Sequence, residues 1–147
     1  MKPTGEPVAE LASRWVLKAE EDLTLARHGL RLGNDCPFGL ICFLAQQCAE
    51  KYLKAMLTWR GIPFGKIHDL AELANLRPTD VEVGVKRRNL DTLTVYAVQP
   101  RYPYAGPPLT RRNAAAAIRL AIQIRDSLRE YLPVPANRRK VNRQASV

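Results

Sequence analysis

The sequence contains few of the residues from which metal sites and nucleophile sites are built. Its 147 residues include two histidines and three cysteines, so a histidine-rich metal site is excluded. The sequence also lacks a glycine-rich phosphate loop, a G-x-S-x-G turn, an H-E-x-x-H pair and a C-x-x-C pair. These absences exclude the enzyme classes that such motifs identify, and we expect neither a metal nor a cofactor.

The three cysteines do not form a ligand set. Cys36, Cys42 and Cys48 are each separated by five intervening residues and fall in or beside one expected helix. A helix turns successive members of such a series by about 240°, so their sulfur atoms cannot converge on one metal ion. We expect free, buried cysteines that pack as small hydrophobic side chains.

Long apolar runs are missing as well. No stretch approaches the roughly 18–20 apolar residues that cross a bilayer. The first seven residues contain two prolines and no apolar stretch, which is unlike a signal peptide. We therefore expect a cytoplasmic protein without membrane contact. The apolar content of 46% and the charged content of 25% are typical of one globular domain of this length.

The formal net charge of +9 is unevenly distributed. Residues 133–147 carry four basic side chains and no acidic one, with two prolines at their start. Such a segment offers no apolar face to pack, so we predict a helical domain over residues 8–132 and a basic, disordered tail over 133–147. A solubilising role for the tail is favoured over phosphate binding, because it contains no aromatic residue.

Apolar residues recur at steps of three and four, which indicates helices, and no run alternates with the period of a strand. The first stripe begins at Leu11 and ends before Gly33; the last begins at Ala114 and ends before Pro133, with Arg111, Arg119 and Arg129 outside it. The pattern predicts an all-α fold, an up-and-down bundle of about five helices.

The second predicted helix, over residues 37–59, follows Asp35 as a candidate N-cap. It is apolar around most of its circumference between Leu40 and Cys48. A helix of this kind lies in the centre of a bundle or at a subunit interface. We predict a homodimer built partly on it.

Capping patterns predict two further helices. Asp69 is spaced three residues before Glu72 and is expected to begin a short helix that ends near Leu76. Thr79 is spaced in the same way before Glu82 and is expected to begin a fourth helix that includes residues 81–97. The four prolines of residues 99–108 predict a rigid, non-helical loop before the last helix.

Polar residues on the most apolar helix form the first candidate site. Gln47, Lys51 and Lys54 share one helix face and could present a strip of hydrogen-bond donors. Glu50 and Lys54 are also spaced as an ion pair within one helix, and for these two the structural role is favoured. For Gln47, with apolar neighbours, we expect a buried hydrogen bond.

Two other segments carry candidate residues. His68 precedes the expected cap Asp69, and a capping and packing role is favoured over catalysis because a lone histidine specifies no reaction. Arg101 and Tyr102 stand before Pro103 in the proline-rich loop. An arginine among aromatic residues suits anion binding or base stacking, and it equally suits a loop anchored by tyrosine packing.

Four short motifs follow one another along the chain. They are Asp22-Leu23 with Ala26, the run Gln47-Cys-Ala-Glu50-Lys51-Tyr-Leu-Lys54, His68-Asp69-Leu70 and Arg101-Tyr102-Pro103. Each motif is weak alone, but the four in this order and at these distances are specific. In them the chain, from about Ser13 to Tyr131, resembles HEPN-domain proteins of the small prokaryotic type.

The resemblance implies a usually dimeric helical bundle in which Gln47, Lys51, His68 and Arg101 cluster. It also implies a nucleotide- or RNA-related role beside a minimal nucleotidyltransferase, as in toxin–antitoxin pairs. The ribonucleolytic branch of the superfamily carries an arginine, four to six intervening residues and then a histidine. Before His68 the corresponding positions are Gly61, Ile62 and Pro63, which argues against RNA cleavage.

Three functions therefore stay open. The favoured one is a non-catalytic module that binds a nucleotide or an RNA phosphate and acts with a nucleotidyltransferase. Its expected ligand-binding residues are Gln47, Lys51, Lys54, His68, Asp69, Arg101 and Tyr102. The alternative is a metal-independent ribonuclease toxin, with His68 and Arg101 as catalytic candidates across a dimer interface. The third is an oligomerising adaptor without a ligand.

Overall fold

The computed structural model describes residues 7–103 and 106–133. This part contains five α-helices and two 3₁₀ turns and no strand, which confirms the all-α prediction. Beyond Pro133 the predicted tail lies outside the described residues. In the described ranges, no helix has the length and apolar character needed to span a membrane. The elements are α1 (Val8–Gly29), η1 (Gly33–Asp35), α2 (Phe38–Trp59), α3 (Leu70–Asn75), α4 (Arg87–Val95), η2 (Gln99–Arg101) and α5 (Arg111–Arg129).

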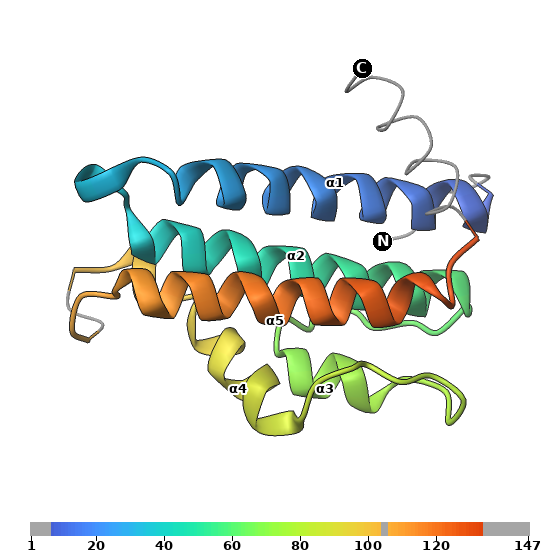
Figure 1. Ribbon diagram of the computed structural model, residues 1–147. Coiled ribbons are helices and arrows are strands. Elements are labelled where there is room, and N and C mark those ends of the chain that lie inside the picture. Colours follow the sequence, from blue (N-terminus) through green and yellow to red (C-terminus); the bar gives the residue numbers. More distant parts are fainter. Residues whose placement is uncertain (1–6, 104–105, 134–147) are drawn as a thin grey trace, which may run out of the picture.

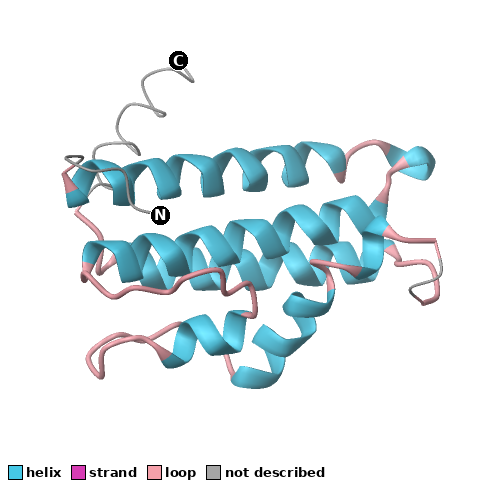
Figure 2. Ribbon diagram, turned by 180° about the vertical axis from the view of Figure 1, so that it is seen from behind, coloured by secondary structure: helices cyan, strands magenta, loops and turns pink. Residues whose placement is uncertain are grey.

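Helix α2 lies at the centre of the bundle and contacts each of the other four α-helices of the described ranges. Helices α1 and α5 pack against it, and the short helices α3 and α4 lie on the side of α2 away from α1 (Figures 1 and 2). α1 runs antiparallel to α2, whereas α5 runs in the same direction as α2, because residues 60–110 lead the chain back along the bundle (Figure 1). The central position of α2 explains why its sequence is apolar on most sides.

Small side chains let the long helices approach one another. The face of α1 toward the core is largely alanine, and the core face of α5 has the same character. Leu11, Trp15 and Leu30, which the sequence pattern placed in the buried stripe of α1, are only half-buried. Burial of apolar surface along these seams is the main source of stability for the bundle. The buried residues on the two helices are Ala12, Val16, Ala19, Leu23, Ala26, Ala114, Ala117, Ile118, Ala121, Ile124 and Leu128.

The apolar circumference of α2 is covered largely by its own chain. Ile41, Cys42, Ala45 and Cys48 are buried within the single chain, and among the large apolar residues of α2 before Cys48 only Leu40 is exposed. The apolar side chains of α2 are therefore buried without a second subunit, and they do not require a subunit interface. The homodimer stays a prediction that must rest on other surfaces.

The fourth helix does not begin where the sequence pattern predicted. Thr79 and Glu82 form no capping box, and α4 begins only at Arg87 and ends at Val95. The chain from Val81 to Gly84 is non-helical, with Val81 and Val83 buried and the residue between them exposed. The prediction was wrong because this segment docks on α5, and tertiary contacts of this kind override a local helix signal.

Residues at the end of α5 and just beyond it hold the docked segment. The Glu82 N–H donates to the hydroxyl of Tyr131 at 3.1 Å, and Ser127 Oγ donates to the Glu82 carbonyl. Gly84 adopts φ +90°, and a Cβ there would lie 2.7 Å from Ser127 Cβ. Only glycine fits so close to α5 with this backbone conformation.

Other boundary predictions have mixed outcomes. Asp69 caps α3 as predicted, with Oδ1 accepting from the Glu72 N–H at 2.9 Å. Asp35 does not cap α2, because it lies in η1 and the N-cap is Pro37. Residues 99–101 were expected to be non-helical but form a 3₁₀ turn, which accepts Pro100 because its first residues need no backbone donor. The cap of α5, Thr110, was not predicted.

Candidate functional site

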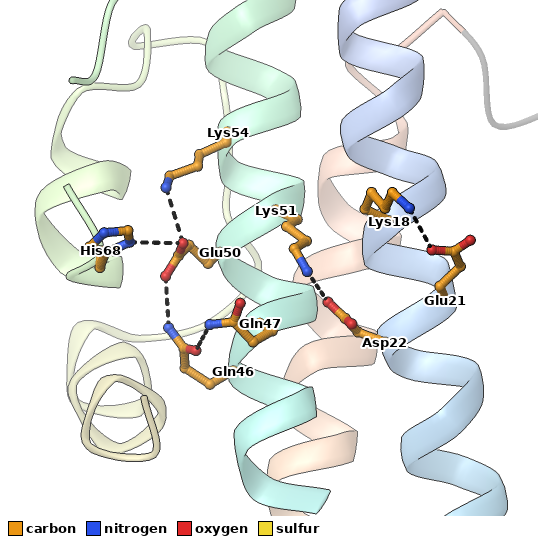
Figure 3. Close-up of polar contacts among 9 residues, drawn as sticks. All are labelled: Lys18, Glu21, Asp22, Gln46, Gln47, Glu50, Lys51, Lys54 and His68. Carbon is orange, nitrogen blue, oxygen red and sulfur yellow. Dashed lines mark hydrogen bonds and ion pairs between the residues drawn. The ribbon is translucent and has the colours of Figure 1, made fainter. Parts of the chain in front are cut away.

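The buried carboxylate of Glu50 organises the polar residues on α2. Gln46 Nε2 donates to Glu50 Oε1 at 3.0 Å, and Lys54 Nζ donates to Oε2 at 3.0 Å. Gln47 Nε2 extends the chain of hydrogen bonds by donating to Gln46 Oε1 at 2.7 Å. Figure 3 shows these side chains on one side of the helix. Each member is hydrogen-bonded, which is the condition under which a polar network can be buried.

The ammonium group of Lys54 has no route to a ligand. Its side chain is 6% exposed, and Nζ lies 5.6 Å from the centre of the Trp15 ring and 5.5 Å from that of Phe64. The two rings and Glu50 together replace the water that the ammonium group loses on burial. The favoured ion-pair role of Glu50 and Lys54 therefore agrees with the geometry, and Lys54 is not placed to bind phosphate.

His68 is the exposed end of the same network. Its Nδ1 lies 3.1 Å from Glu50 Oε2, while the side chain as a whole is 68% exposed (Figure 3). A carboxylate can only accept, so this contact places the proton on Nδ1. The neutral ring then has Nε2 as a free acceptor, and the protonated ring has a free donor there. A buried carboxylate thus orients an imidazole that solvent can reach.

Lys51 points to a different side of α2. Its Nζ bonds Asp22 Oδ2 on α1, and Figure 3 shows this pair between the two helices, away from His68. Burial raises the pKa of Asp22 above its ordinary value, and the hydrogen bond from Lys51 opposes that rise without cancelling it. Lys51 therefore acts first as the partner of a half-buried carboxylate that links α1 to α2.

Arg101 lies nearer the start of α2. Its guanidinium carbon is 5.4 Å from the centre of the Phe43 ring and 5.9 Å from that of Tyr102. Both Arg101 and Tyr102 are exposed. Two aromatic rings fix the orientation of the guanidinium group and leave its N–H donors free for an anion. Gly39 supports the arrangement, because a Cβ there would lie 3.2 Å from Pro100 Cβ.

The predicted site residues are therefore only partly brought together. Phe43, Gln47 and Glu50 follow one another on one face of α2, so Arg101 over Phe43 and His68 on Glu50 flank the half-buried Gln47. Phe43 and Glu50, the residues of α2 that Arg101 and His68 contact, are seven residues apart, which is about 10 Å along the helix. Lys51 and Lys54 are engaged elsewhere, and no contact joins Lys51, His68 and Arg101 in the described residues. Asp69 is occupied as the cap of α3.

Several functional neighbours were not identified from the sequence. Gln46, rather than Gln47, is the fully buried amide. Phe43, Trp15 and Phe64 supply the rings beside Arg101 and Lys54. Phe43 lies seven residues before Glu50, and this spacing could have indicated that the two share one face of the helix. Trp15 and Phe64 become neighbours of Lys54 only in the folded bundle.

A second polar cluster joins α1, α2 and α5. Tyr52 donates its hydroxyl hydrogen to Glu20, and Arg129 and Arg125 approach the same carboxylate at 3.1 and 3.7 Å. Burial and the nearby Glu20 carboxylate raise the pKa of Tyr52 far above its ordinary value. Arg129 was expected on the solvent face, but its side chain is 12% exposed, and its buried Nε has no partner in the described residues. That expectation was wrong because α1 supplies its partner, Glu20.

The cysteines are free and buried as predicted. Burial raises the pKa of Cys42 to about 11 and that of Cys48 further, so neither thiol is a reactive nucleophile. Within the described ranges, no group of three or more His, Cys, Asp or Glu side chains is placed to share a metal ion.

Comparisons with known proteins agree with the four motifs. The chain matches the family model of the HEPN domain over residues 12–131. TT1696 from Thermus thermophilus is 33% identical, with a TM-score of 0.71 over 82% of this chain and 98% of that protein. ST0689, described as an archaeal HEPN homologue, is 33% identical, with a TM-score of 0.60 over 81% and 95%. None of the curated proteins matches the chain. By sequence and by fold, the chain belongs to the HEPN domain family.

Proposed function

We propose that this HEPN protein binds a phosphate group of a nucleotide or of RNA through Arg101, without catalysis. The observation that carries the proposal is the placement of the exposed Arg101 guanidinium over the rings of both Phe43 and Tyr102, 5.4 and 5.9 Å from their centres. A guanidinium group held in this way presents a preorganised fork of N–H donors to a phosphate. The exposed face of Tyr102 offers a stacking surface for a base.

His68 adds a second contact to the proposed site. It contacts Glu50, which lies about 10 Å along α2 from Phe43, the residue that Arg101 covers. A ligand that reaches both residues needs more than one polar group, as a nucleotide or a short RNA strand has. Gln47, which lies between the two anchors, completes this surface.

Titration of the full-length protein with ATP and with a short RNA, by calorimetry, tests the proposal. We expect Arg101→Ala to weaken binding by about 1–3 kcal/mol, the scale of a lost charge-assisted hydrogen bond. Arg101→Lys should recover only part of this loss, because lysine lacks the planar fork. Arg88→Ala is the matched control, since Arg88 is an exposed arginine on α4, a different helix. Unchanged binding in Arg101→Ala would reject the proposal.

A second candidate, metal-independent cleavage of RNA, is favoured by the Glu50–His68 pair. In that reaction Nε2 of a neutral His68 would take the proton of a ribose 2′-hydroxyl as its oxygen attacks the adjacent phosphorus, and an arginine would stabilise the charged phosphorane. The 5′-oxygen would then leave with a proton, and a 2′,3′-cyclic phosphate would remain. His68 and Arg101 contact different residues of α2, Glu50 and Phe43, and no contact between the two is found in the described residues. Incubation of nuclease-free protein with total RNA distinguishes the two: intact RNA in wild type and His68→Ala supports binding alone, and cleavage lost in His68→Ala supports the second candidate.

The resemblance to small HEPN proteins supports a partner as well. We propose that the protein acts with a minimal nucleotidyltransferase in a toxin–antitoxin-like pair in the cytoplasm. Co-expression with the product of a neighbouring nucleotidyltransferase gene, followed by affinity purification, tests this pairing. A stable complex supports it, and separate elution of the two proteins at micromolar concentration contradicts it.

A further inference from the structure

The seam between α1 and α5 carries a concentration of arginine that the proposed site does not use. Over residues 24–35 and 111–122 the chain has five arginines and one carboxylate, Asp35. The two stretches are the last part of α1 with η1 and the first part of α5, and they lie at the same end of the bundle (Figure 1). Arg111 joins them by hydrogen bonds to the carbonyl oxygens of Leu30 and Gly33. The acidic residues of α1 and α5 lie elsewhere on the two helices.

A shallow, open hollow lies on this seam, and arginine lines it. A groove of about 520 Å³ lies between Arg27, Leu30 and Arg31 of the α1 end and Arg111 and Ile118 of α5. A second shallow hollow of about 250 Å³ lies beside it on α1 and its end, lined by Thr24, Arg27, His28 and Arg31. Because Arg27 and Arg31 border both hollows, these two side chains flank a concave surface.

The three arginines of the groove have different roles. Arg111 donates to the carbonyl oxygens of Leu30 at 2.7 Å and Gly33 at 3.1 Å, and it stacks on Phe38 at 5.0 Å. It therefore satisfies carbonyl oxygens at the end of α1 that have no partner within the helix, and it holds one wall of the groove in place. Arg27 and Arg31 are exposed, and their side chains make no hydrogen bond or ion pair with the part of the chain that the structure describes. These two guanidinium groups are available to a ligand.

We propose that the α1–α5 groove binds the phosphate backbone of a nucleic-acid strand. A concave, arginine-lined surface tracks a negatively charged polymer, and the guanidinium fork matches phosphate oxygens. The residues that line the two hollows include no aromatic ring apart from His28, so binding is governed by the backbone and is independent of base sequence. The groove is formed by α1 and α5, so this inference does not depend on the site at Arg101.

Fluorescence anisotropy with a labelled 15-nucleotide single-stranded RNA tests the groove in the full-length protein. We expect Arg27→Gln with Arg31→Gln to weaken binding at least tenfold and to reduce the dependence of log K on log salt by about 1.4, the value for two lost contacts to a single strand. The control, Arg87→Gln with Arg88→Gln on α4, removes the same charge from another exposed surface and should change binding less than twofold. Single-stranded DNA of the same sequence should bind comparably.

Three results would overturn the inference. They are equal losses in the two double variants, unchanged binding in Arg27→Gln with Arg31→Gln, and preferential binding to phosphatidylserine vesicles over RNA. Arg101→Ala separates this inference from the proposed function, because RNA binding that survives Arg101→Ala and fails in the groove variant supports the groove alone. Arg27 and Arg31 are exposed on α1 and its end, so we expect the double variant to keep the melting temperature of the wild-type protein. Thermal melting checks that each variant is folded.

Discussion

Glu50 connects more of the candidate site than any other residue. Its two oxygen atoms accept from Gln46 and Lys54 on its own helix and contact His68 from the segment before α3. Burying a carboxylate is unfavourable unless its charge is paired and its oxygen atoms are hydrogen-bonded. Glu50 satisfies both conditions. Its contacts hold the side chains of Gln46 and Lys54 in place on α2 and fix the orientation of His68.

Removal of the Glu50 charge should therefore be costly. We expect Glu50→Gln to lower the free energy of unfolding by about 3 kcal/mol, because it leaves the Lys54 ammonium group buried without its counter-ion. Adding Lys54→Met should recover part of the loss. Urea denaturation measures both. Glu21→Gln is the control, since Glu21 pairs with Lys18 on the exposed face of α1, and it should change stability by less than about 0.5 kcal/mol. Equal effects of Glu50→Gln and Glu21→Gln would contradict the buried role.

Cys42 predicts how stability responds to alkaline pH. Burial raises the pKa of its thiol from 9.0 to about 11, so between these values the folded chain keeps a proton that the unfolded chain has released. The free energy of unfolding therefore falls as the pH rises from 9 to 11, by on the order of 2 kcal/mol for this thiol. Denaturation of wild type and Cys42→Ala at pH 8 and pH 11 measures the effect. A fall of the same size in both proteins would show that other groups cause it.

The long helices could be predicted from the sequence because their signal is local. Steps of three and four locate α1, α2 and α5 to within a few residues, and the Asp69 cap locates α3. The start of α4 could not be predicted in this way. Val81 and Val83 are buried in a segment held by α5, more than forty residues later, and neither Ser127 nor Gly84 reveals that contact in the sequence.

The candidate site was predictable to a similar degree. His68 and Arg101 could be selected as unusual polar residues before helical or rigid segments, and the spacing of Glu50 and Lys54 indicated their ion pair. The engagement of Lys51 with Asp22 and the enclosure of Lys54 by Trp15 depend on how α1 rotates against α2. Helix rotation is decided by packing over the whole seam, so no single motif reveals it.

Helix caps provide a direct comparison between a real and a false signal. Thr110 accepts from the Asn113 N–H, and the Asn113 side chain accepts in return from the Thr110 N–H at 2.9 Å. We expect Thr110→Ala to lower the free energy of unfolding by about 1 kcal/mol. Thr79→Ala, at the position where the sequence pattern wrongly predicted a cap, should change it by less than about 0.5 kcal/mol, the range of ordinary surface substitutions. Thermal or urea denaturation of the two variants measures this, and the reverse order would contradict the assignment of the caps.

At the scale of the whole molecule, the two proposed binding surfaces involve different helices. The Arg101 and His68 surface is formed by α2, η2 and the segment before α3, whereas the arginine-lined groove is formed by α1 and α5. The two surfaces share no lining residue, so a substitution in one leaves the side chains of the other in place.

The surface around η2 gives the remaining basis for the homodimer prediction. Three large apolar side chains there are each more than half exposed, which indicates a contact surface: Leu40, Val95 and Val98. We expect light scattering at micromolar concentration to give the mass of a dimer, and Leu40→Asp with Val98→Asp to give that of a monomer. A monomer mass for the wild-type protein would refute the homodimer.

The central claim is that a phosphate-bearing ligand binds beside Arg101 and His68. An amide ¹H–¹⁵N NMR titration of the full-length protein with ATP locates the ligand directly. The account predicts the largest shift changes at Phe43, Gln47, His68, Arg101 and Tyr102, and the loss of these changes in Arg101→Ala. Shift changes confined to residues outside this surface, or no change at millimolar ATP, would contradict it.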